Sequence, residues 1–288
     1  MKNPDRPGTE FGRGGPSIFD TARAIVWLML LIAAGLVLLP AQMIAHGFNL
    51  SARRTIPMLF HRVVLRAFGA RITVRGEATG HRPALFVPNH VSWMDIMVLG
   101  AFAPLSFVAK SEVAAWPVFG YLARLQRSIF VDRDRRHTTS RTADEMSARM
   151  REGEPVVLFA EGTSSDGNRT LRFRPALIGA AESLARATGE TVWIQPIALA
   201  YRRISGLPSG RQHRPRVAWV GDIDLVPHAW ALLKDGAVDI ELIFGNPVPF
   251  DPNGDRKAIA LFLEQRVRGL HASALTGKEE NLPPLAAL

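Results

Sequence analysis

The most restrictive feature of the sequence is an uncharged, strongly apolar stretch over residues 24–45. As a helix it is long enough to span, or nearly span, the roughly 30 Å of hydrocarbon in a lipid bilayer. A cleaved signal peptide is the main alternative, but the length of the stretch and the long polar leader before Arg23 argue against it. Pro40 can kink or end the helix, so a dip into one leaflet stays open beside a full span.

A second helix, basic and amphipathic, is expected directly after this stretch. Over residues 49–68, apolar side chains recur with the i, i+3, i+4, i+7 spacing of one helix face. The basic residues that lie largely off that face are Arg53, Arg54, Arg62 and Arg66. Such a helix is typical of the membrane interface, and the alternative is that its apolar side packs on a globular core. The arginine excess places the rest of the chain at the cytoplasmic face of the inner (cytoplasmic) membrane.

An excess of basic residues narrows the choice of partner. Lys and Arg number 35 against 26 acidic residues, and the pI is near 10.8, which suits an anionic lipid surface or a nucleic acid. The sequence has no zinc-finger spacing, RNP-like strand or arginine-rich tail. We therefore expect anionic membrane lipids as a partner and no nucleic acid. The lack of cysteine excludes disulfides, thiolate metal sites and a cysteine nucleophile.

The rest of the chain alternates short apolar segments with amphipathic ones, which is the pattern of an α/β fold with a mainly parallel central sheet flanked by helices. Strands are expected over residues 71–75, 84–87, 106–109, 129–131, 155–159, 192–201, 216–221 and 238–244. Helices are expected over residues 95–103, 116–125, 138–151, 175–188 and 256–274. The chain should divide into a disordered leader (1–17), membrane-anchoring helices (18–68), one globular domain (69–275) and a loose tail (276–288).

A polar turn follows the expected strand at residues 84–87. Pro88 stops the strand, the chain turns, and a helix opens near Ser92. His90 in the turn and Asp95 in the first helical turn can then meet, so that the carboxylate fixes the imidazole tautomer and leaves the other ring nitrogen free as a base. The alternative is structural: Ser92 and Asp95 form a capping box, and His90 is an ordinary turn residue.

Three further polar clusters each follow the carboxyl end of an expected strand, where open α/β sheets build their sites. One begins at Lys110, the next is Asp132 with Arg133, and the third covers residues 161–165. Several such clusters after successive strands predict a single site at this edge of the sheet. No set of metal-ligating residues has a recognisable spacing, so we expect no metal.

The order of these blocks resembles the four-block signature of the PlsC-type glycerolipid acyltransferases. The blocks read N-H-x-S-W-x-D from Asn89, A-K-x-E-x-x-x-x-P-x-x-G from Ala109, F-V-D-R from Phe130 and F-x-E-G-T from Phe159. The resemblance covers roughly residues 50 to 250. It implies an α/β core on a membrane surface that transfers a fatty acyl group to a hydroxyl of a lysolipid acceptor. The co-substrate would be an acyl thioester, acyl-ACP or acyl-CoA, with acyl carrier protein as a possible partner and no bound cofactor.

The resemblance also implies roles for single residues. His90 would be the general base that takes the proton of the acceptor hydroxyl, and Asp95 would orient it and stabilise its imidazolium form. Because the acceptor oxygen is itself the nucleophile, no covalent acyl-enzyme is needed. Lys110 would assist the donor or the oxyanion, and the alternative is a solvated surface lysine.

The acceptor headgroup site is implied at Arg133, Glu161, Gly162 and Thr163. A guanidinium can bind an anionic group with two hydrogen bonds, and a Gly-Thr turn presents backbone N–H donors. The structural alternative for Glu161 is an ion pair with Arg133 and no ligand.

One position departs from the family pattern and bears on the acceptor. Many members that form phosphatidic acid carry an arginine directly after E-G-T, where this chain has Ser164. The tracts at 161–169 and 219–228 look more like those of the lyso-ornithine lipid acyltransferases. Lyso-ornithine lipid is therefore the expected acceptor, and 1-acyl-sn-glycerol-3-phosphate is the alternative, with Arg169 supplying the missing cation. A non-catalytic lipid-binding membrane protein is a further alternative, and the paired His90 and Asp95 argue against it.

Overall fold

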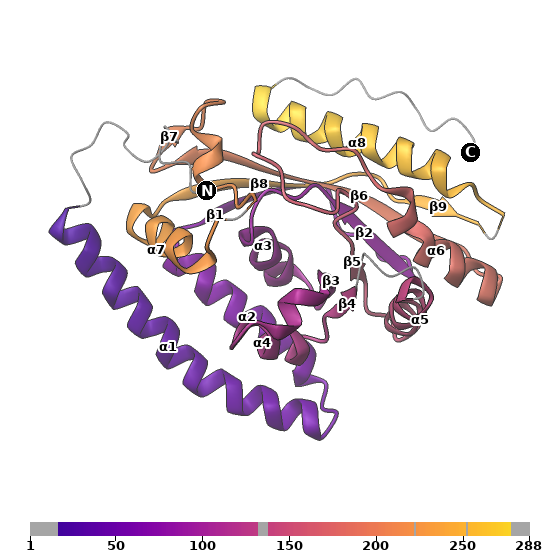
Figure 1. The fold of residues 1–288 in the computed structure, drawn as a ribbon, viewed down its shortest axis with the longest axis horizontal. Helices are drawn as coiled ribbons and strands as arrows, with labels where there is room; N and C mark the ends of the chain where they lie inside the picture. The colour runs from indigo at the N-terminus through magenta and orange to yellow at the C-terminus, as the bar shows by residue number, and fades with distance from the viewer. Residues whose placement is uncertain (1–16, 132–137, 222, 252, 278–288) are drawn as a thin grey trace, which may run out of the picture.

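The computed structural model describes residues 17–131, 138–221, 223–251 and 253–277. Figure 1 shows a central sheet with helices on both faces and a long N-terminal helix along one side of the molecule. The sheet runs in the order β1 (Arg71–Arg75), β8 (Val238–Phe244), β6 (Val192–Ile204), β2 (Ala84–Pro88), β5 (Val156–Val157), β3 (Ser106–Lys110) and β4 (Ile129–Val131). Two short strands, β7 (Leu207–Pro208) and β9 (Val248–Phe250), pair antiparallel with β6.

The strand directions confirm the expected mainly parallel sheet. Neighbours from β6 through β2, β5 and β3 to β4 are parallel. The strand direction reverses once in the sheet, between β6 and β8, which are antiparallel. The edge strand β1 is parallel to its neighbour β8. The carboxyl ends of β2 and β6 therefore point toward one edge of the sheet, and those of β1 and β8 point toward the opposite edge.

Helices cover both faces of the sheet (Figure 1). One face carries α2 (Ala52–Ala67), α3 (Met94–Phe102) and α7 (Leu225–Asp235), and the other carries α5 (Thr138–Arg151), α6 (Pro175–Thr188) and α8 (Arg256–Thr276). Phe86 of β2 packs in the first layer and Leu85 in the second, as alternating strand side chains must. The centre of the sheet is thus buried on both sides, which holds the turn after β2 in place. The short helix α4 (Phe119–Leu125) and the 3-10 turns Ser111–Ala115 and Arg214–Arg216 complete the described elements.

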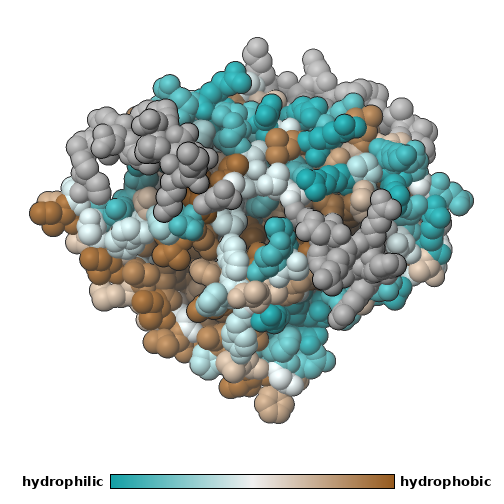
Figure 2. Space-filling model, viewed as in Figure 1, coloured by the Kyte–Doolittle hydropathy of each residue, from teal (hydrophilic) through white to brown (hydrophobic). Residues whose placement is uncertain are grey.

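The apolar stretch forms one continuous helix, α1 (Ile18–Gly47), which passes Pro40 without ending. It begins at a capping box in which Ser17 and Asp20 exchange hydrogen bonds. Among the described residues it is the one helix long and apolar enough to cross a membrane. Its outward side is apolar, and Figure 2 shows this brown surface at the lower left. The exposed side chains include Ile25, Met29, Ile32, Leu36, Val37, Met43 and Ile44.

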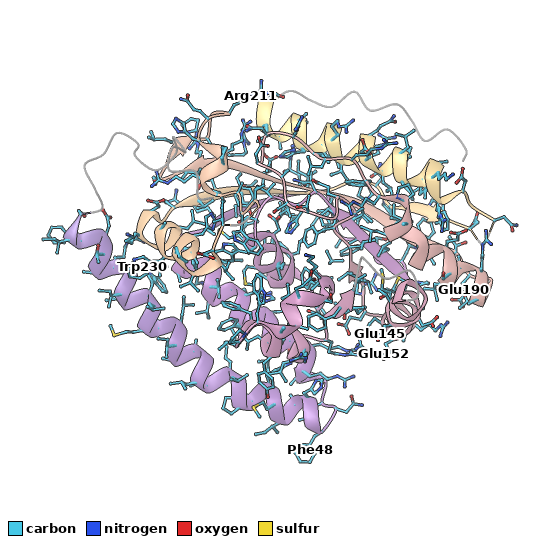
Figure 3. The ribbon with its side chains drawn as sticks, in the orientation of Figure 1. Phe48, Glu145, Glu152, Glu190, Arg211 and Trp230 are labelled. Carbon is cyan, nitrogen blue, oxygen red and sulfur yellow. The ribbon has the colours of Figure 1, made fainter. Side chains whose placement is uncertain are left out.

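Polar side chains fasten both ends of α1 to the globular domain. Arg23 Nη2 donates to two carbonyl oxygens at the carboxyl end of α7, at 2.7 and 3.1 Å. Gln42 Nε2 donates to the carbonyls of Arg53 (2.9 Å) and Leu125 (2.8 Å), the last residue of α4. Figure 3 shows Phe48 beyond the end of α1, pointing away from the domain. The helix therefore lies along the domain from Arg23 to Gln42.

The basic amphipathic helix is present as α2, and its apolar side packs on the core. His61, Val64 and Leu65 are buried, and His61 meets α3 at Gly100, where an added Cβ would lie 2.1 Å from the imidazole Nδ1. Arg62 Nε donates to the carbonyl of Ala101 at 3.0 Å. Packing on the core, given above as the alternative, is confirmed; contact of α2 with a membrane stays a prediction.

Two expected strands differ from the structure, and one helix was not expected. The strand expected at 216–221 is absent, so that prediction was wrong. The segment begins at the end of a 3-10 turn and buries two adjacent side chains, Val217 and Ala218, outside the sheet. The strand expected at 155–159 is shortened to β5, because the chain leaves the ladder after Val157. Helix α7 was not predicted, since its short span carries Pro227 in the first turn.

Candidate active site

The turn after β2 is joined to the neighbouring strand by the side chain of Asn89. Pro88, the last residue of β2, lies opposite Ile197 of β6. Asn89 Nδ2 then donates to the carbonyl of Leu199 at 3.0 Å, and Leu199 N–H donates to Asn89 Oδ1 at 2.8 Å. The buried amide thus replaces a strand residue in the ladder and fixes the point where the chain leaves the sheet.

His90 and Asp95 make the expected contact, with 2.8 Å between Nδ1 and Oδ2. Asp95 is fully buried in the first turn of α3. The same Oδ2 also accepts hydrogen bonds from the backbone N–H groups of Val91 (2.7 Å) and Ser92 (2.9 Å). Asp95 therefore binds the imidazole and also satisfies two backbone N–H groups before α3. The capping box is only half formed, because Ser92 Oγ accepts no hydrogen bond from any described N–H group, and the catalytic role of the pair stays a prediction.

The other carboxylate oxygen is bound by a residue that the sequence analysis did not single out. Tyr201 donates its hydroxyl to Asp95 Oδ1 at 2.6 Å. Burial, reinforced by the charge of Asp95, raises the pKa of the Tyr201 phenol well above its usual value, so the hydroxyl stays protonated. Tyr201 reaches the turn because β6 continues past Ile197, the partner of the last residue of β2. Its place at the carboxyl end of the expected strand 192–201 was the available signal.

These contacts leave one imidazole nitrogen of His90 unused. The ring stacks on Phe159 with 4.0 Å between centroids, and the side chain is 17% exposed. Within the described part of the chain, no group hydrogen-bonds to Nε2. With Nδ1–H donating to Asp95, Nε2 carries a free lone pair at the surface of the site, which is the state that a general base needs.

Glu161 joins two backbone segments beneath the turn. Its Oε1 accepts from His90 N–H at 3.0 Å and its Oε2 from Leu171 N–H at 3.1 Å. Burial raises the pKa of Glu161 to about 8, against the pull of these two donors. The next residue, Gly162, has a φ of 75°, a conformation that favours glycine. Both oxygens of Glu161 hold backbone in place, and its contact with an acceptor stays a prediction.

Two loops flank the turn: residues 164–170, called here the Gly167 loop, and residues 210–219, called the Arg214 loop. Ser165 N–H donates to the carbonyl of His90 at 2.8 Å, and Trp219 N–H donates to the carbonyl of Val91 at 2.9 Å. The loops also meet each other, because the Ser164 hydroxyl donates to the Trp219 carbonyl. Segments about fifty residues apart in the chain therefore form the walls beside His90.

The other predicted site residues lie farther out or cannot be placed. Lys110 is exposed and forms an ion pair with Glu112, with 2.6 Å between Nζ and Oε1. Thr163 and Arg169 are exposed on the loop that follows Glu161. Arg133 lies outside the described residues. Contacts of these four predicted residues with a substrate stay predictions.

Comparison with known proteins shows to which family the chain belongs. An acyltransferase family model matches residues 71–200. A lyso-ornithine lipid O-acyltransferase from Brucella abortus is 46% identical over 263 residues, which are 91% of this chain and 98% of that protein. The chain belongs to the acyltransferase family. A protein of the same name from Rhizobium meliloti is 44% identical to this acyltransferase over 254 residues, 88% of this chain and 87% of its own.

More distant relatives share the fold of this acyltransferase. The crystal structure of the 1-acyl-sn-glycerophosphate acyltransferase PlsC from Thermotoga maritima matches it with a TM-score of 0.61 at 19% identity, over 90% of this chain and 96% of that one. A 1-acyl-sn-glycerol-3-phosphate acyltransferase from Neisseria meningitidis is 28% identical over 212 residues, 73% of this chain and 78% of its own. The expected glycerolipid acyltransferase fold is confirmed.

The acyltransferase also has an apolar cavity away from the His90 turn. Its volume is about 230 Å³, and its lining includes Phe86, Leu99, Phe102 and Phe244. The lining also includes Leu105, just before β3, and Phe102 is the last residue of α3, so the cavity lies toward the amino ends of β2 and β3, away from His90. Among the described residues, no three His, Asp or Glu side chains gather closely enough to hold a metal ion.

Proposed function

We propose that this acyltransferase moves a fatty acyl group from an acyl thioester to the hydroxyl of lyso-ornithine lipid. The observation that carries the chemistry is His90, held at Nδ1 by Asp95 and free at Nε2 among the described residues. The acceptor rests on the relatives named lyso-ornithine lipid O-acyltransferases, which are 46% and 44% identical. The relative named for 1-acyl-sn-glycerol-3-phosphate is only 28% identical, which keeps that acceptor as the second candidate.

In the proposed reaction, Nε2 of His90 takes the proton of the acceptor hydroxyl as its oxygen attacks the thioester carbonyl. A C–O bond forms, the carbonyl oxygen becomes an oxyanion, and the C–S bond then breaks as the carbonyl reforms. The imidazolium returns its proton to the leaving thiolate. Asp95 stabilises the imidazolium during this cycle through its contact with Nδ1.

The acyl donor is proposed to be acyl-ACP or acyl-CoA. Both present the same thioester on an anionic carrier, and the net charge of +9 supports attraction of either one. Lys110 and Arg169 are exposed cations that fit a role in holding anionic parts of the two substrates. Arg133, Gly162 and Thr163 remain proposed contacts of the acceptor headgroup.

We infer that α1 inserts into one leaflet without crossing the membrane. Both its ends contact the same globular domain, Arg23 at α7 and Gln42 at α4, whereas a spanning helix carries its ends to opposite sides of the bilayer. Its outward apolar side chains are then buried in lipid beside the domain. The arginines of α2 support the cytoplasmic face of the inner membrane as the location.

An acceptor panel tests the proposal. The full-length enzyme in mixed micelles would receive lyso-ornithine lipid or lysophosphatidic acid, each with acyl-ACP and with acyl-CoA, and His90→Ala would serve as the inactive control. We expect acyl transfer to lyso-ornithine lipid at the higher kcat/KM. A wild-type enzyme that uses lysophosphatidic acid alone would contradict the acceptor, and a His90→Ala variant with normal turnover would contradict the mechanism.

A further inference from the structure

Beside the turn after β2, called here the catalytic turn, lies a partly buried cation that forms no ion pair with a carboxylate of the described residues. The side chain of Arg214 has one hydrogen-bond partner within the described part of the chain, the neutral amide oxygen of Asn168, 3.1 Å from Nη1. Its Nε is buried and makes no hydrogen bond to any described group. Burial, followed by the nearby charge of Arg211, lowers the pKa of the Arg214 guanidinium, and the charge of Asp166 opposes this shift without cancelling it. A guanidinium taken out of water normally has a carboxylate partner, so this one is suited to an anion that comes from outside the protein.

Two other arginines of the structure show such a partner. Arg216, two residues along the same loop, binds Asp235 with both ends of its guanidinium, at 2.8 and 2.5 Å. The buried Arg127 binds Glu152 and Glu154. Arg214 therefore differs from Arg216 of the same loop, because it forms no hydrogen bond to a carboxylate of the described residues.

The side-chain amide of Asn168 forms hydrogen bonds to both Arg214 and the carboxylate of Asp166. Its Oδ1 accepts from Arg214, and its Nδ2 donates to Asp166 Oδ2 (3.1 Å) and to the carbonyl of Arg211 (3.0 Å). The amide thus uses both donors and its acceptor, which fixes its orientation. Asp166 is exposed and also accepts the backbone N–H of Asn168 at 3.0 Å. These hydrogen bonds outweigh the opposing effect of partial burial and lower the pKa of Asp166, so it is a carboxylate at neutral pH.

This arrangement lies directly against the catalytic turn. An added Cβ on Gly167 would lie 3.2 Å from Val91 Cγ1 and 3.5 Å from Arg214 Cβ, so this glycine is the spacer between the turn and the arginine. Ser165, in the same loop, donates to the carbonyl of His90. A headgroup held by these loops would place the rest of its lipid within reach of His90.

We propose that Arg214 binds the carboxylate of the acceptor headgroup and that Asp166 binds its ammonium group, with Asn168 setting their spacing. The proposal rests on the proposed function, because ornithine is an amino acid that offers both charges. It also gives a reason for discrimination. A phosphate headgroup could engage Arg214, but its remaining charge would face Asp166, and like charges brought together select against that partner.

The test crosses two enzymes with two acceptors. Wild type and Arg214→Gln would be assayed with lyso-ornithine lipid and with its carboxyl methyl ester, which lacks the negative charge. We expect Arg214→Gln to lower kcat/KM for lyso-ornithine lipid by about 10–100-fold, the effect of losing one charge-assisted hydrogen bond, and to leave kcat/KM for the ester within about twofold of wild type. An equal loss on both acceptors would overturn the assignment, because it would mean that Arg214 only supports the loop.

Two further variants keep the result interpretable. Arg216→Gln removes a cation of the same loop that already has a carboxylate partner, and it should leave both kcat/KM values near wild type. Arg214→Lys keeps the charge without the two-pronged geometry and should restore part of the lost kcat/KM on lyso-ornithine lipid alone. No restoration by Arg214→Lys, or a loss on lyso-ornithine lipid in Arg216→Gln equal to that in Arg214→Gln, would overturn the proposal.

A separate variant tests the role of Asp166. Asp166→Asn should lower kcat/KM for lyso-ornithine lipid but leave it unchanged for an analogue with an acetylated side-chain amine, and it should improve the use of lysophosphatidic acid. Unchanged discrimination between these acceptors would overturn the role of Asp166. The failure of the proposed function gives a different result. The proposed function is contradicted if the wild-type enzyme does not acylate lyso-ornithine lipid. The inference about Arg214 is contradicted if the wild-type enzyme and Arg214→Gln acylate lyso-ornithine lipid equally well.

Discussion

Replacing Asp95 by asparagine removes one charge and tests what the carboxylate contributes. Three donors converge on Oδ2, the Nδ1–H of His90 and the backbone N–H groups of Val91 and Ser92, whereas Oδ1 meets the hydroxyl of Tyr201. An amide therefore has one favourable orientation, with its oxygen at the Oδ2 position. Its NH₂ group then faces Tyr201, whose hydroxyl can turn to accept. His90 keeps its tautomer in this variant, and Nε2 stays the base.

The expected loss follows from this geometry. The variant keeps a hydrogen bond to Nδ1 but loses the charge that stabilises the imidazolium. A charge-assisted hydrogen bond contributes roughly twice as much as a neutral one, a difference of about 1–2 kcal/mol. We therefore expect kcat to fall by roughly 5–30-fold. Where asparagine imposes the wrong tautomer on a catalytic histidine, the loss is about 10⁴-fold.

The assay is kcat for Asp95→Asn at saturating lyso-ornithine lipid, with thermal unfolding measured on the same protein. A loss near 10⁴-fold in a folded variant would refute the reasoning, because it would mean that the amide has inverted. An unchanged kcat would show that the charge of Asp95 plays no part. Adding Tyr201→Phe to Asp95→Asn leaves the amide N–H without its acceptor. The free energy of unfolding should therefore fall by about 1–3 kcal/mol more.

The remaining predictions concern catalysis, pH and packing. His90→Ala should lower kcat by about 10²–10⁴-fold in a protein whose circular dichroism is unchanged, because the carboxylate that bound the imidazole keeps three other donors. Since burial raises the pKa of Glu161 from 4.5 to about 8, the folded protein binds a proton that the unfolded chain releases in this range. The free energy of unfolding from urea titrations should therefore fall as pH rises through that window, and less so in Glu161→Gln; equal slopes would contradict the raised pKa. Gly100→Ala should lower stability by about 1–3 kcal/mol, because the new Cβ would lie 2.1 Å from Nδ1 of His61. The matched control is Gly35→Ala, whose Cβ meets nothing within 4 Å, and equal melting temperatures would contradict the packing of α2 on α3.

The sequence predicted the parts of the site that depend on local order. His90 and Asp95 lie within one strand–turn–helix segment, so their contact follows from the strand end and the helix start alone. Tyr201 is 106 residues from Asp95, and its contact depends on how far β6 extends past β2, which no local pattern contains. Asn89 also pairs with a strand 110 residues away.

The errors have equally physical causes. The segment 216–221 is apolar because Val217 and Ala218 are both buried, and a short buried segment outside the sheet cannot be told from a strand by its apolar content alone. The parallel sheet was predictable because strands and helices alternate along the chain, but the reversal between β6 and β8 depends on long-range pairing. The unpaired state of Arg214 was equally hidden, since only the folded chain shows which charges find partners.

The two hydrogen bonds between the Asn89 side chain and the backbone of Leu199 have a consequence for motion in the enzyme. It joins the catalytic turn to strands at the centre of the sheet, so the amide of Leu199 should exchange its hydrogen with solvent only when the whole domain unfolds. The Gly167 loop and the Arg214 loop touch the turn through single backbone hydrogen bonds, so their amides should exchange through small local openings. The proposed proton transfer and the proposed headgroup recognition thus occupy regions of different local stability, so we expect that the choice of acceptor can change without loosening the proposed base.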